Sequence, residues 1–300
     1  MTKLGALPRI LYIMGFGRGG STILEVLLAN NPGIFGSGEL THILTDAILR
    51  NVPCSCGAAS LRCPIWSKVW ERLNWTEETA RSNAQFLRRV EHHARFQLMA
   101  AGLVGRATWE RYAQVNGELF GAISEVTGAE VVIDSSKYAG RALALHRAFP
   151  GRVQAICLTR SPQGLMHSFQ KPHRDEQLQK SALGACFYYV YVLSCLHFSL
   201  RRMGEQALSV RYEELASNPE TVIRRIGGWW GRDVSQVLGN LRAGESLDVG
   251  HIVTGNRLRY QGRVRFEPVL ENVQFAERSR RYAVRFMEAY EKIWGLGGTA

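Results

Sequence analysis

The chain has 300 residues, 46% of them hydrophobic, which suits one α/β domain with an insertion, or two small domains, around a sizeable core. Its formal net charge of +11 favours anionic ligands, and nucleic acid has to be considered, although no run of five or more basic residues is present. Residues 1–9 lack the apolar core of a signal peptide, so we expect a cytoplasmic protein. The longest apolar stretch, Ala185 to Leu200, is shorter than the ~20 residues that span a bilayer, so we expect a buried helix there.

The first predicted unit is a strand, a glycine-rich turn and a helix. The apolar run Ile10 to Met14 predicts a buried parallel strand, and Ile23 to Leu28 predicts a helix. Four glycines lie between them, at positions 15, 17, 19 and 20. Such a turn lets backbone N–H groups converge at a helix start, which favours a bound phosphate or sulfate group.

The details of this turn separate two kinds of chemistry. A nucleoside-triphosphate loop reads G-x-x-x-x-G-K-[ST], but Ser21 stands at the lysine position and the cation is Arg18, inside the turn. A nucleotide-dependent phosphotransferase, the alternative function, would lack its lysine and an obvious acidic partner for magnesium. A turn that only packs its helix is the remaining interpretation.

The next predicted element is a short strand from Ile34 that ends at Gly36 to Gly38. Glu39 then lies at the carboxyl edge of the sheet, where open α/β sheets bind ligands. It is also placed to interact, as a helix-start carboxylate, with the helix dipole.

Three cysteines follow, at positions 54, 56 and 63, with His42 upstream. Their C-x-C-x6-C spacing differs from the paired C-x-x-C units of zinc sites, so we expect a cysteine-pinned loop, reduced or bridged, and no metal. The other cysteines lie in apolar segments and are typical of reduced core residues.

Residues 66–128 are charged and helical in pattern, and we interpret them as a helical insertion within a single domain that spans 1–300. Val131 to Asp134 predicts a buried strand, and Ser135-Ser136 is predicted to cap a helix that contains Lys137. The strand Val153 to Thr159 delivers Arg160 to a turn, and Pro162 suits the first position of the helix that carries Ser168.

Leu208 to Tyr212 is the last predicted strand, and the helix after Asn218-Pro219 is expected to end near Gly227-Gly228. Residues 244–265 show no clear helix. The final element, at about 272–294, is predicted to be an amphipathic helix that buries its aromatic and aliphatic residues, namely Tyr282, Phe286, Tyr290 and Ile293.

The strands, each followed by a helix, argue for a parallel, doubly wound α/β sheet. Three features then coincide in order: the loop Gly17 to Thr22, the strand-end Arg160 with Ser168, and the segment Val210-Arg-Tyr-Glu-Glu-Leu215. Together they resemble the sulfotransferase family that uses 3′-phosphoadenosine 5′-phosphosulfate (PAPS), over roughly 8–50 and 128–232. The resemblance is closer to a bacterial branch with a Cys-x-Cys-Gly segment than to small-phenol enzymes, and it implies a P-loop-like sulfotransferase fold.

The resemblance also implies roles for individual residues. Arg18 would face the 5′-phosphosulfate, Arg160 and Ser168 would bind the 3′-phosphate, and Tyr212 would lie near the adenine. The remaining donor contacts would come from the first loop and from a basic C-terminal segment, namely Gly19, Gly20, Ser21, Thr22, Gly255, Asn256, Arg257 and Arg259.

Catalysis would begin when the acceptor hydroxyl attacks sulfur in line and loses its proton to Glu39. Arg18 replaces the family's lysine and can only stabilise charge, and Lys137 would contact the transferred sulfonate. Asp134 and His42 are second choices for the base. We expect a small-molecule acceptor, either a lipid-like or natural-product alcohol or a carbohydrate, and no nucleic acid; the sequence does not predict the oligomeric state.

Overall fold

The computed structural model describes residues 7–92, 95–170, 180–255, 257–268 and 275–293, and only the backbone of 257 and 259. At its centre lie five parallel strands in the order β2-β3-β1-β4-β5. Their bounds are β1 Arg9–Gly15, β2 Ile34–Gly36, β3 Val131–Lys137, β4 Val153–Thr159 and β5 Ala207–Arg211. The parallel sheet predicted from the sequence is therefore confirmed.

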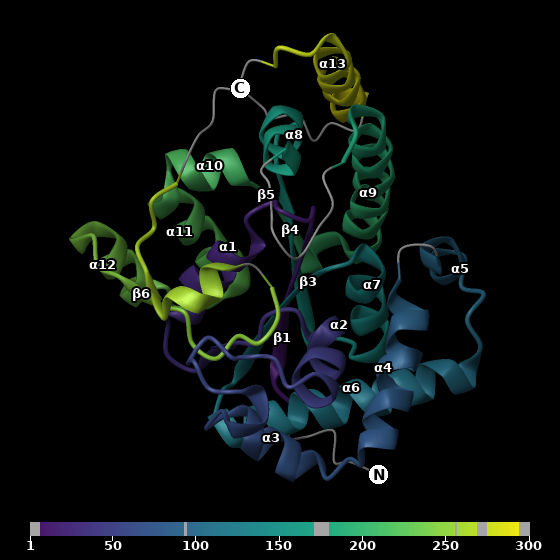
Figure 1. The fold of residues 1–300 in the computed structure, drawn as a ribbon, viewed down its shortest axis with the longest axis vertical. Coiled ribbons are helices and arrows are strands. Elements are labelled where there is room, and N and C mark those ends of the chain that lie inside the picture. The colour runs from purple at the N-terminus through teal and green to yellow at the C-terminus, as the bar shows by residue number, and fades with distance from the viewer. Residues whose placement is uncertain (1–6, 93–94, 171–179, 256, 269–274, 294–300) are drawn as a thin grey trace.

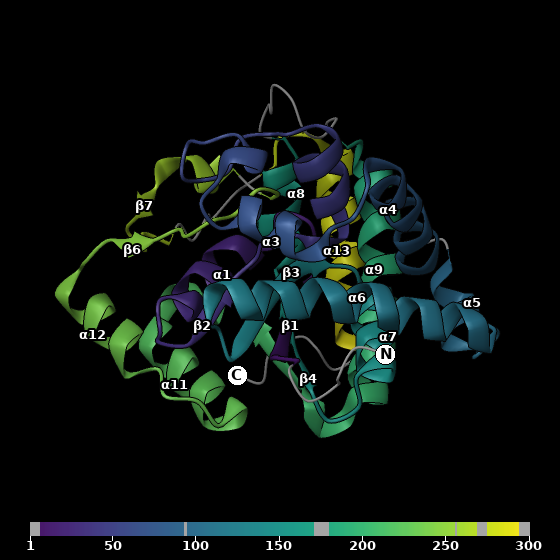
Figure 2. The ribbon, with the colours of Figure 1, turned by 90° about the horizontal axis from the view of Figure 1, so that it is seen from below.

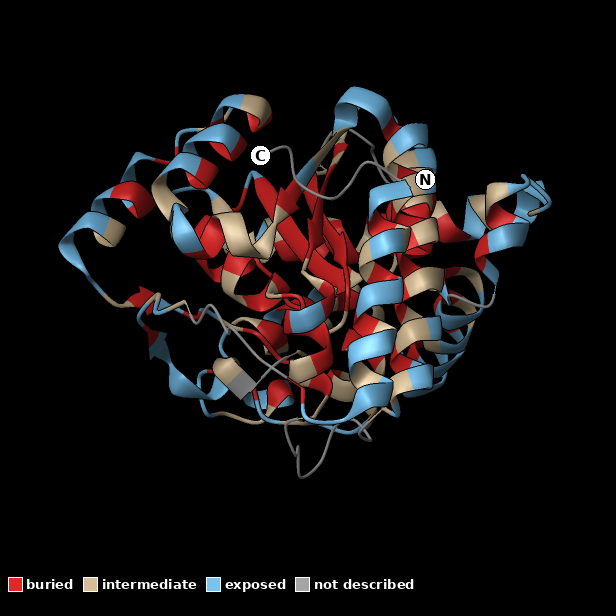
Figure 3. Cartoon of the chain, turned by 90° about the horizontal axis from the view of Figure 1, so that it is seen from above, coloured by how far each residue is buried: buried red, intermediate tan, exposed pale blue. Residues whose placement is uncertain are grey.

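The central strand β1 is buried on both faces, which explains its unbroken apolar sequence. Leu11 and Ile13 pack against α1 (Ser21–Ala29), α11 (Pro219–Trp230) and α12 (Ser235–Ala243). Tyr12 and Met14 face the other side, towards α6 (Arg106–Thr127), α7 (Ala139–Ala148) and α9 (Ala182–Met203). Helices thus cover both faces of the sheet, with buried residues inward and exposed residues outward (Figures 1 and 3). Each buried aliphatic side chain contributes about 1.5–3 kcal/mol to this arrangement.

The other elements lie around this three-layer body. Segment 66–128 contains several helices, and Figure 2 shows the longest of them, α6, crossing in front of the strands. The remaining helices are α2 Leu40–Ile43, α3 Trp66–Leu73, α4 Glu77–Glu91, α5 Phe96–Ala100, α8 Pro162–Gln170, α10 Tyr212–Ser217 and α13 Arg278–Ile293. Shorter pieces are a π-helix Leu44–Leu49, 3₁₀ turns Ser60–Arg62, Gly204–Gln206 and Arg257–Gln261, and a hairpin of β6 Leu247–Asp248 with β7 Arg263–Val264.

The predicted start of α7 is wrong. Ser135 and Ser136 do not cap a helix, because β3 continues through both of them to Lys137 and α7 begins at Ala139. Both serines are buried and bonded to carboxylates, Ser135 to Glu25 and Ser136 to Asp134. These bonds satisfy the two hydroxyls inside the sheet, so the serines bind carboxylates where the sequence suggested that they cap a helix.

The predicted end of helix α11 also differs from the structure. Helix α11 runs through Gly227 and Gly228 to Trp230, because Gly227 allows close packing against Val234 and Gly231 takes the left-handed cap position.

Helix α13 buries a different face from the predicted one. Val284, Met287 and Glu291 are buried, whereas Tyr282 is 67% exposed, Phe286 57% and Ile293 76%. Of the four residues predicted to be buried, Tyr290 is half-buried and packs against the core. The helix packs on α9 and α8, and its buried Glu291 pairs with Arg211 of β5. An ion pair therefore decides which face turns inward.

The long apolar helix α9 is part of the folded body. In the described part of the chain, Ala182–Gln206 is the one helical stretch with the length and composition of a membrane span, although only 39% of its apolar window is buried. It is longer than the predicted Ala185–Leu200 by three residues at each end, 182–184 before it and 201–203 after it. Its contacts with α7, α13 and β5 make it a core helix of the α/β body.

Candidate anion-binding site

The glycine turn after β1 adopts the conformation expected of an anion cradle. Arg18 and Gly20 both have positive φ, 66° and 98°, and the Gly19 N–H donates to the Phe16 carbonyl at 3.1 Å. Ser21 and Thr22 form the first turn of α1, whose unpaired N–H groups face the turn. A side chain at Gly20 would come within 2.4 Å of the Tyr212 ring. Glycine is therefore required there both by this close approach and by its positive φ.

A tyrosine of α9 supports this turn, and sequence reasoning missed it. The Gly17 N–H donates to the Tyr188 hydroxyl at 2.9 Å. Phe16 stacks on the neighbouring Tyr189, with ring centroids 4.8 Å apart and planes tilted by 7°. Lys180 lies 5.1 Å from the Tyr188 ring, which adds a cation to the same edge. The sequence marked α9 only as an apolar helix and gave no sign of this contact.

The structure brings Arg160, Arg18 and Tyr212 together from three separate loops. Arg160, directly after β4, donates from Nη1 to the Arg18 carbonyl at 2.8 Å. Its guanidinium lies 4.6 Å from the centre of the Tyr212 ring, in cation–π geometry. These loops follow β1, β4 and β5, so they meet at the carboxyl edge of the sheet, next to the point where the strand order reverses.

Helix α8 presents one face to Arg160. A side chain at Gly164 would lie 2.9 Å from the Arg160 Nε, so this guanidinium rests directly against the helix. Ser168 follows Gly164 by four residues and therefore shares that face. The Arg160 Nε is buried and lacks a hydrogen-bond partner within the described residues, which leaves a strong donor for an anionic ligand.

Glu39 lies at the same edge, before α2, and forms an ion pair with Lys137. The Lys137 side chain is 15% exposed and the Glu39 side chain 18%, and Lys137 has a positive φ of 73°. Thr254 fixes the Glu39 backbone, since its hydroxyl accepts the Glu39 N–H at 3.0 Å and donates to the Glu39 carbonyl at 2.8 Å. Thr254 is a second residue that sequence reasoning missed.

The C-terminal segment reaches the glycine turn through Gly255. A side chain at this position would lie 3.3 Å from a Glu39 carboxylate oxygen and 3.8 Å from the Thr22 hydroxyl. The predicted Asn256 and the side chains of Arg257 and Arg259 fall outside the described residues. Their predicted contacts with a nucleotide stay predictions.

The two second-choice bases lie in different surroundings. Asp134 has no exposed surface, and its oxygens accept from the Ser136 N–H at 3.0 Å and the Arg141 Nε at 2.7 Å. His42 packs edge-on against Tyr138, with ring centroids 6.2 Å apart. Asp134 is thus occupied by structural partners. Of the three candidate bases, Glu39 is the one placed beside Gly255 and Thr22.

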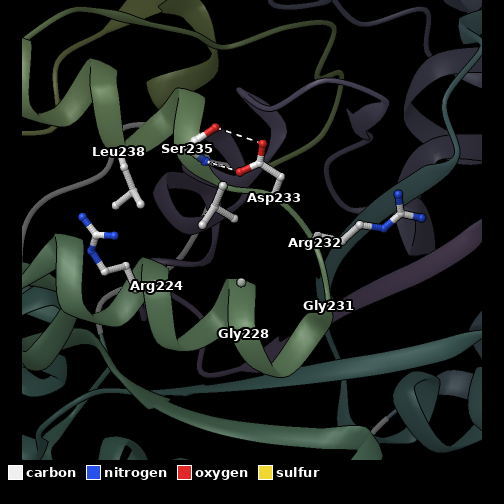
Figure 4. Close-up of a pocket in the computed structure, with 9 residues that line it drawn as sticks. Arg224, Gly228, Gly231, Arg232, Asp233, Ser235 and Leu238 are labelled. Carbon is white, nitrogen blue, oxygen red and sulfur yellow. Dashed lines mark hydrogen bonds between the residues drawn. The ribbon is translucent and has the colours of Figure 1, made fainter.

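A separate hollow lies between α11 and α12 (Figure 4), with a volume of about 460 Å³. Its charged residues already have partners: Arg232 pairs with Glu130 at 2.7 Å, and Asp233 accepts from the Ser235 N–H at 2.9 Å. None of its lining residues comes from the loops after β1, β4 or β5. We therefore assign the candidate site to the carboxyl edge of the sheet.

Comparisons with known proteins identify the family and the fold. A sequence model of the sulfotransferase family matches residues 8–236. The sulfotransferase domain of the curacin biosynthetic pathway superposes with a TM-score of 0.53 at 18% identity, over 94% of this chain and 98% of that chain. The sulfotransferase domain of the Synechococcus PCC 7002 olefin synthase gives 0.51 at 18%, over 97% of each chain. Sulfotransferase STF9 from Mycobacterium avium gives 0.53 at 16%, over 96% of this chain and 76% of that chain. No curated protein matches the sequence significantly.

Proposed function

The chain belongs to the sulfotransferase family, and from that premise we propose that it transfers a sulfonate group from PAPS to an acceptor hydroxyl. The chain also shares its fold with solved sulfotransferase structures. Membership of a branch with a Cys-x-Cys-Gly segment stays a prediction.

One observation carries the choice of donor: the Arg160 guanidinium donates to the Arg18 carbonyl. This bond joins the residue that follows β4 to the backbone of the glycine turn, which supports a donor that contacts both of these segments. Arginine suits this task because its planar fork matches phosphate oxygens. The buried, unpartnered Arg160 Nε supports a 3′-phosphate at that end, with Ser168 on the same helix face. Tyr212, under Arg160, would border the adenine.

The residues at the other end suit sulfonate transfer. When bound, PAPS supplies an activated sulfonate whose S–O bond to the 5′-phosphate breaks as the acceptor oxygen forms its bond to sulfur. The Gly20 N–H and the hydroxyls of Ser21 and Thr22 would hold this end of the donor, whereas the Gly19 N–H is bonded to the Phe16 carbonyl and shapes the turn. Arg18 and Lys137 would stabilise the negative charge that grows on the bridging oxygen, which remains on the departing adenosine 3′,5′-bisphosphate.

Glu39 is the proposed general base, taking the acceptor's proton. Its contact with Lys137 and its position beside Gly255 and Thr22 support this role, because they hold the carboxylate next to the glycine turn. We expect a small-molecule acceptor, lipid-like or carbohydrate, and a cytoplasmic enzyme.

The donor can be tested by ligand-induced stabilisation of the purified chain. Adenosine 3′,5′-bisphosphate should raise Tm. At a hundredfold excess over Kd, it should add about 2.7 kcal/mol to the free energy of unfolding. Adenosine 5′-phosphate differs from it only by the 3′-phosphate and should stabilise the protein much less. Equal stabilisation by both ligands would contradict the proposed donor. Arg160→Lys, which keeps the charge but loses the fork, should reduce the difference between them.

A further inference from the structure

The cysteine-rich loop contains a convergence of metal-binding groups that the sequence did not reveal. The side chains of Cys54, Cys56, Cys63 and His251 place their ligand atoms within 4.8 Å of one another. His251 follows Cys63 by 188 residues, so local spacing gave no sign of it. The three cysteines come from the loop 51–63, and the histidine from the C-terminal segment that precedes Thr254.

The distances fit a tetrahedral ion. The Cys54 and Cys63 sulfurs are 3.6 Å apart, and the His251 Nδ1 lies 3.9 Å from the first and 3.2 Å from the second. In a tetrahedron, Zn–S bonds of about 2.3 Å and a Zn–N bond of about 2.0 Å put neighbouring ligand atoms roughly 3.5–3.8 Å apart. A disulfide would need about 2.05 Å between sulfurs. The three separations lie near the tetrahedral values and well beyond a disulfide, and the Cys56 sulfur is within 4.8 Å of the other ligand atoms.

Cysteine binds metal through its sulfur as the thiolate, and backbone N–H groups lie at two of the three sulfurs. The N–H groups of Ile65 and Trp66 hydrogen-bond to the Cys63 sulfur, and the N–H of Cys56 to the Cys54 sulfur. Cys54 and Cys63 are buried, whereas Cys56 is exposed.

Further hydrogen bonds fix His251 against the loop. The Trp66 indole donates to the His251 carbonyl at 2.7 Å. Ser55 donates to the Gly250 carbonyl at 2.5 Å and accepts the Ile252 N–H at 2.8 Å, so bonds lie on both sides of the histidine. The fourth ligand is thus held in place before any ion binds.

We propose that Cys54, Cys56, Cys63 and His251 bind one Zn²⁺ in a closed tetrahedral site. Thiolate and imidazole ligands suit this ion, and four protein ligands leave no open position for a substrate, so its role is structural. The ion ties the cysteine loop to the segment that carries Thr254, three residues after His251. Because Thr254 holds the Glu39 backbone, zinc also stabilises one wall of the proposed sulfonate site.

Elemental analysis of the full chain, purified after growth with added Zn²⁺, tests this assignment. We expect about one zinc per chain, with binding strong enough to survive dialysis. Cys63→Ser and His251→Ala should each lose most of it. Cys186→Ser is the matched control, because this half-buried cysteine lies on α9, outside the cluster, and should keep the full zinc content.

A second pair of measurements guards against a variant that merely misfolds. His251→Cys should retain zinc, since a fourth thiolate completes an equivalent site. Co²⁺ in place of Zn²⁺ should give the visible absorption of a tetrahedral cobalt thiolate. The proposal is overturned if the intact chain holds no zinc, if Cys63→Ser keeps it, or if intact-mass analysis shows that two of the three cysteines have lost their hydrogens to a disulfide.

Discussion

At the scale of single residues, the pairing of Glu39 with Lys137 determines how the proposed reaction would begin. Lys137 ends β3 in a left-handed conformation, which turns its side chain towards Glu39. A general base has to accept the acceptor's proton, and in the proposed reaction the Glu39 carboxylate does so. In the proposed reaction Lys137 would also contact the sulfonate, so one cation would serve both the base and the transferred group.

Glu39→Gln tests this assignment of the base. The amide keeps the size of the side chain but cannot accept the acceptor's proton, so kcat should fall by about 10²–10⁴-fold. The Kd for adenosine 3′,5′-bisphosphate should change little, because the proposed donor contacts come from other residues. Steady-state kinetics and calorimetry measure the two quantities, with the exposed Glu78→Gln of α4 as the control. A kcat close to that of the unaltered protein would exclude Glu39 as the base.

Gly164→Ala tests whether the Arg160 guanidinium binds the donor. The new methyl group would lie 2.9 Å from the Arg160 Nε and push the guanidinium off α8. Losing one charge-assisted hydrogen bond, worth about 1.5–3 kcal/mol, should weaken adenosine 3′,5′-bisphosphate binding about tenfold or more. Tm should not fall, since alanine favours a helix over glycine by about 0.5–1 kcal/mol.

Gly239→Ala is the matched control, because this glycine of α12 has nothing within 4 Å of an added methyl group. It should leave the Kd unchanged. Adenosine 5′-phosphate should bind both variants equally, and a parallel loss for both nucleotides would indicate that Gly164→Ala disturbs the whole cradle instead of the Arg160 end.

Site residues were predictable where a local rule fixes their position. Arg18 lies in a turn whose glycines are visible in the sequence. Arg160 directly follows β4 and Glu39 lies three residues after β2, so the sequence placed both at the carboxyl edge. Tyr188 and Thr254 could not be found in this way. Each meets the site only because α9 and the C-terminal segment pack across it, and such contacts leave no periodic signal in the sequence.

At the scale of elements, helix α1 contains a carboxyl group that couples its packing to pH. Glu25 is fully buried and accepts from the Gly38 N–H at 2.6 Å and the Ser135 hydroxyl at 2.5 Å. Burial, the largest cause, raises its pKa from 4.5 to about 7, although both hydrogen bonds act in the opposite direction. The carboxyl links α1 to the loop that positions Glu39.

This shift has a definite sign. The folded state binds the Glu25 proton more tightly than the unfolded state, so the free energy of unfolding should fall as pH rises from about 4.5 to about 7 and then level off. At about 1.4 kcal/mol per pKa unit the change amounts to about 3 kcal/mol. Glu25→Gln mimics the protonated side chain and should remove that dependence. Urea unfolding of both proteins between pH 5 and 8 measures this dependence. If the free energies of unfolding of the two proteins change in parallel with pH, the raised pKa of Glu25 is contradicted.

The elements themselves were largely predictable, and the exceptions have physical causes. Strand β4 has the predicted bounds, because its apolar run is flanked by Gly151 and Pro162. The face of α13 was mispredicted because a buried ion pair, Glu291 with Arg211, outweighed the aromatic residues. Hydrophobic patterning assumes that charges face water, and it fails where a partner on a distant strand neutralises the charge.

At the scale of the whole molecule, a buried ionic cluster joins the helical segment 66–128 to the sheet. Arg141 of α7 pairs with Glu91 of α4 and, at 2.7 Å, with Asp134 of β3, and none of the three side chains is more than 1% exposed. Tyr112 of α6 donates to Glu91 at 2.9 Å. Four elements on one face of the sheet therefore depend on a single guanidinium.

Removing that guanidinium should destabilise the whole fold. Arg141→Met keeps much of the volume but leaves two buried carboxylates without their cation, which costs about 3–5 kcal/mol. The Tm should fall by several degrees, whereas Arg72→Met, which breaks only the exposed pair with Glu125, should leave Tm nearly unchanged.

Adding Glu91→Gln to Arg141→Met tests the electrostatic cause, because it removes one of the orphaned charges while keeping an acceptor for Tyr112. The double variant should recover part of the lost Tm. If it is no more stable than Arg141→Met alone, the loss comes from packing, and the ionic cluster does not hold the helical segment to the sheet. Thermal unfolding followed by circular dichroism distinguishes these results without reference to activity.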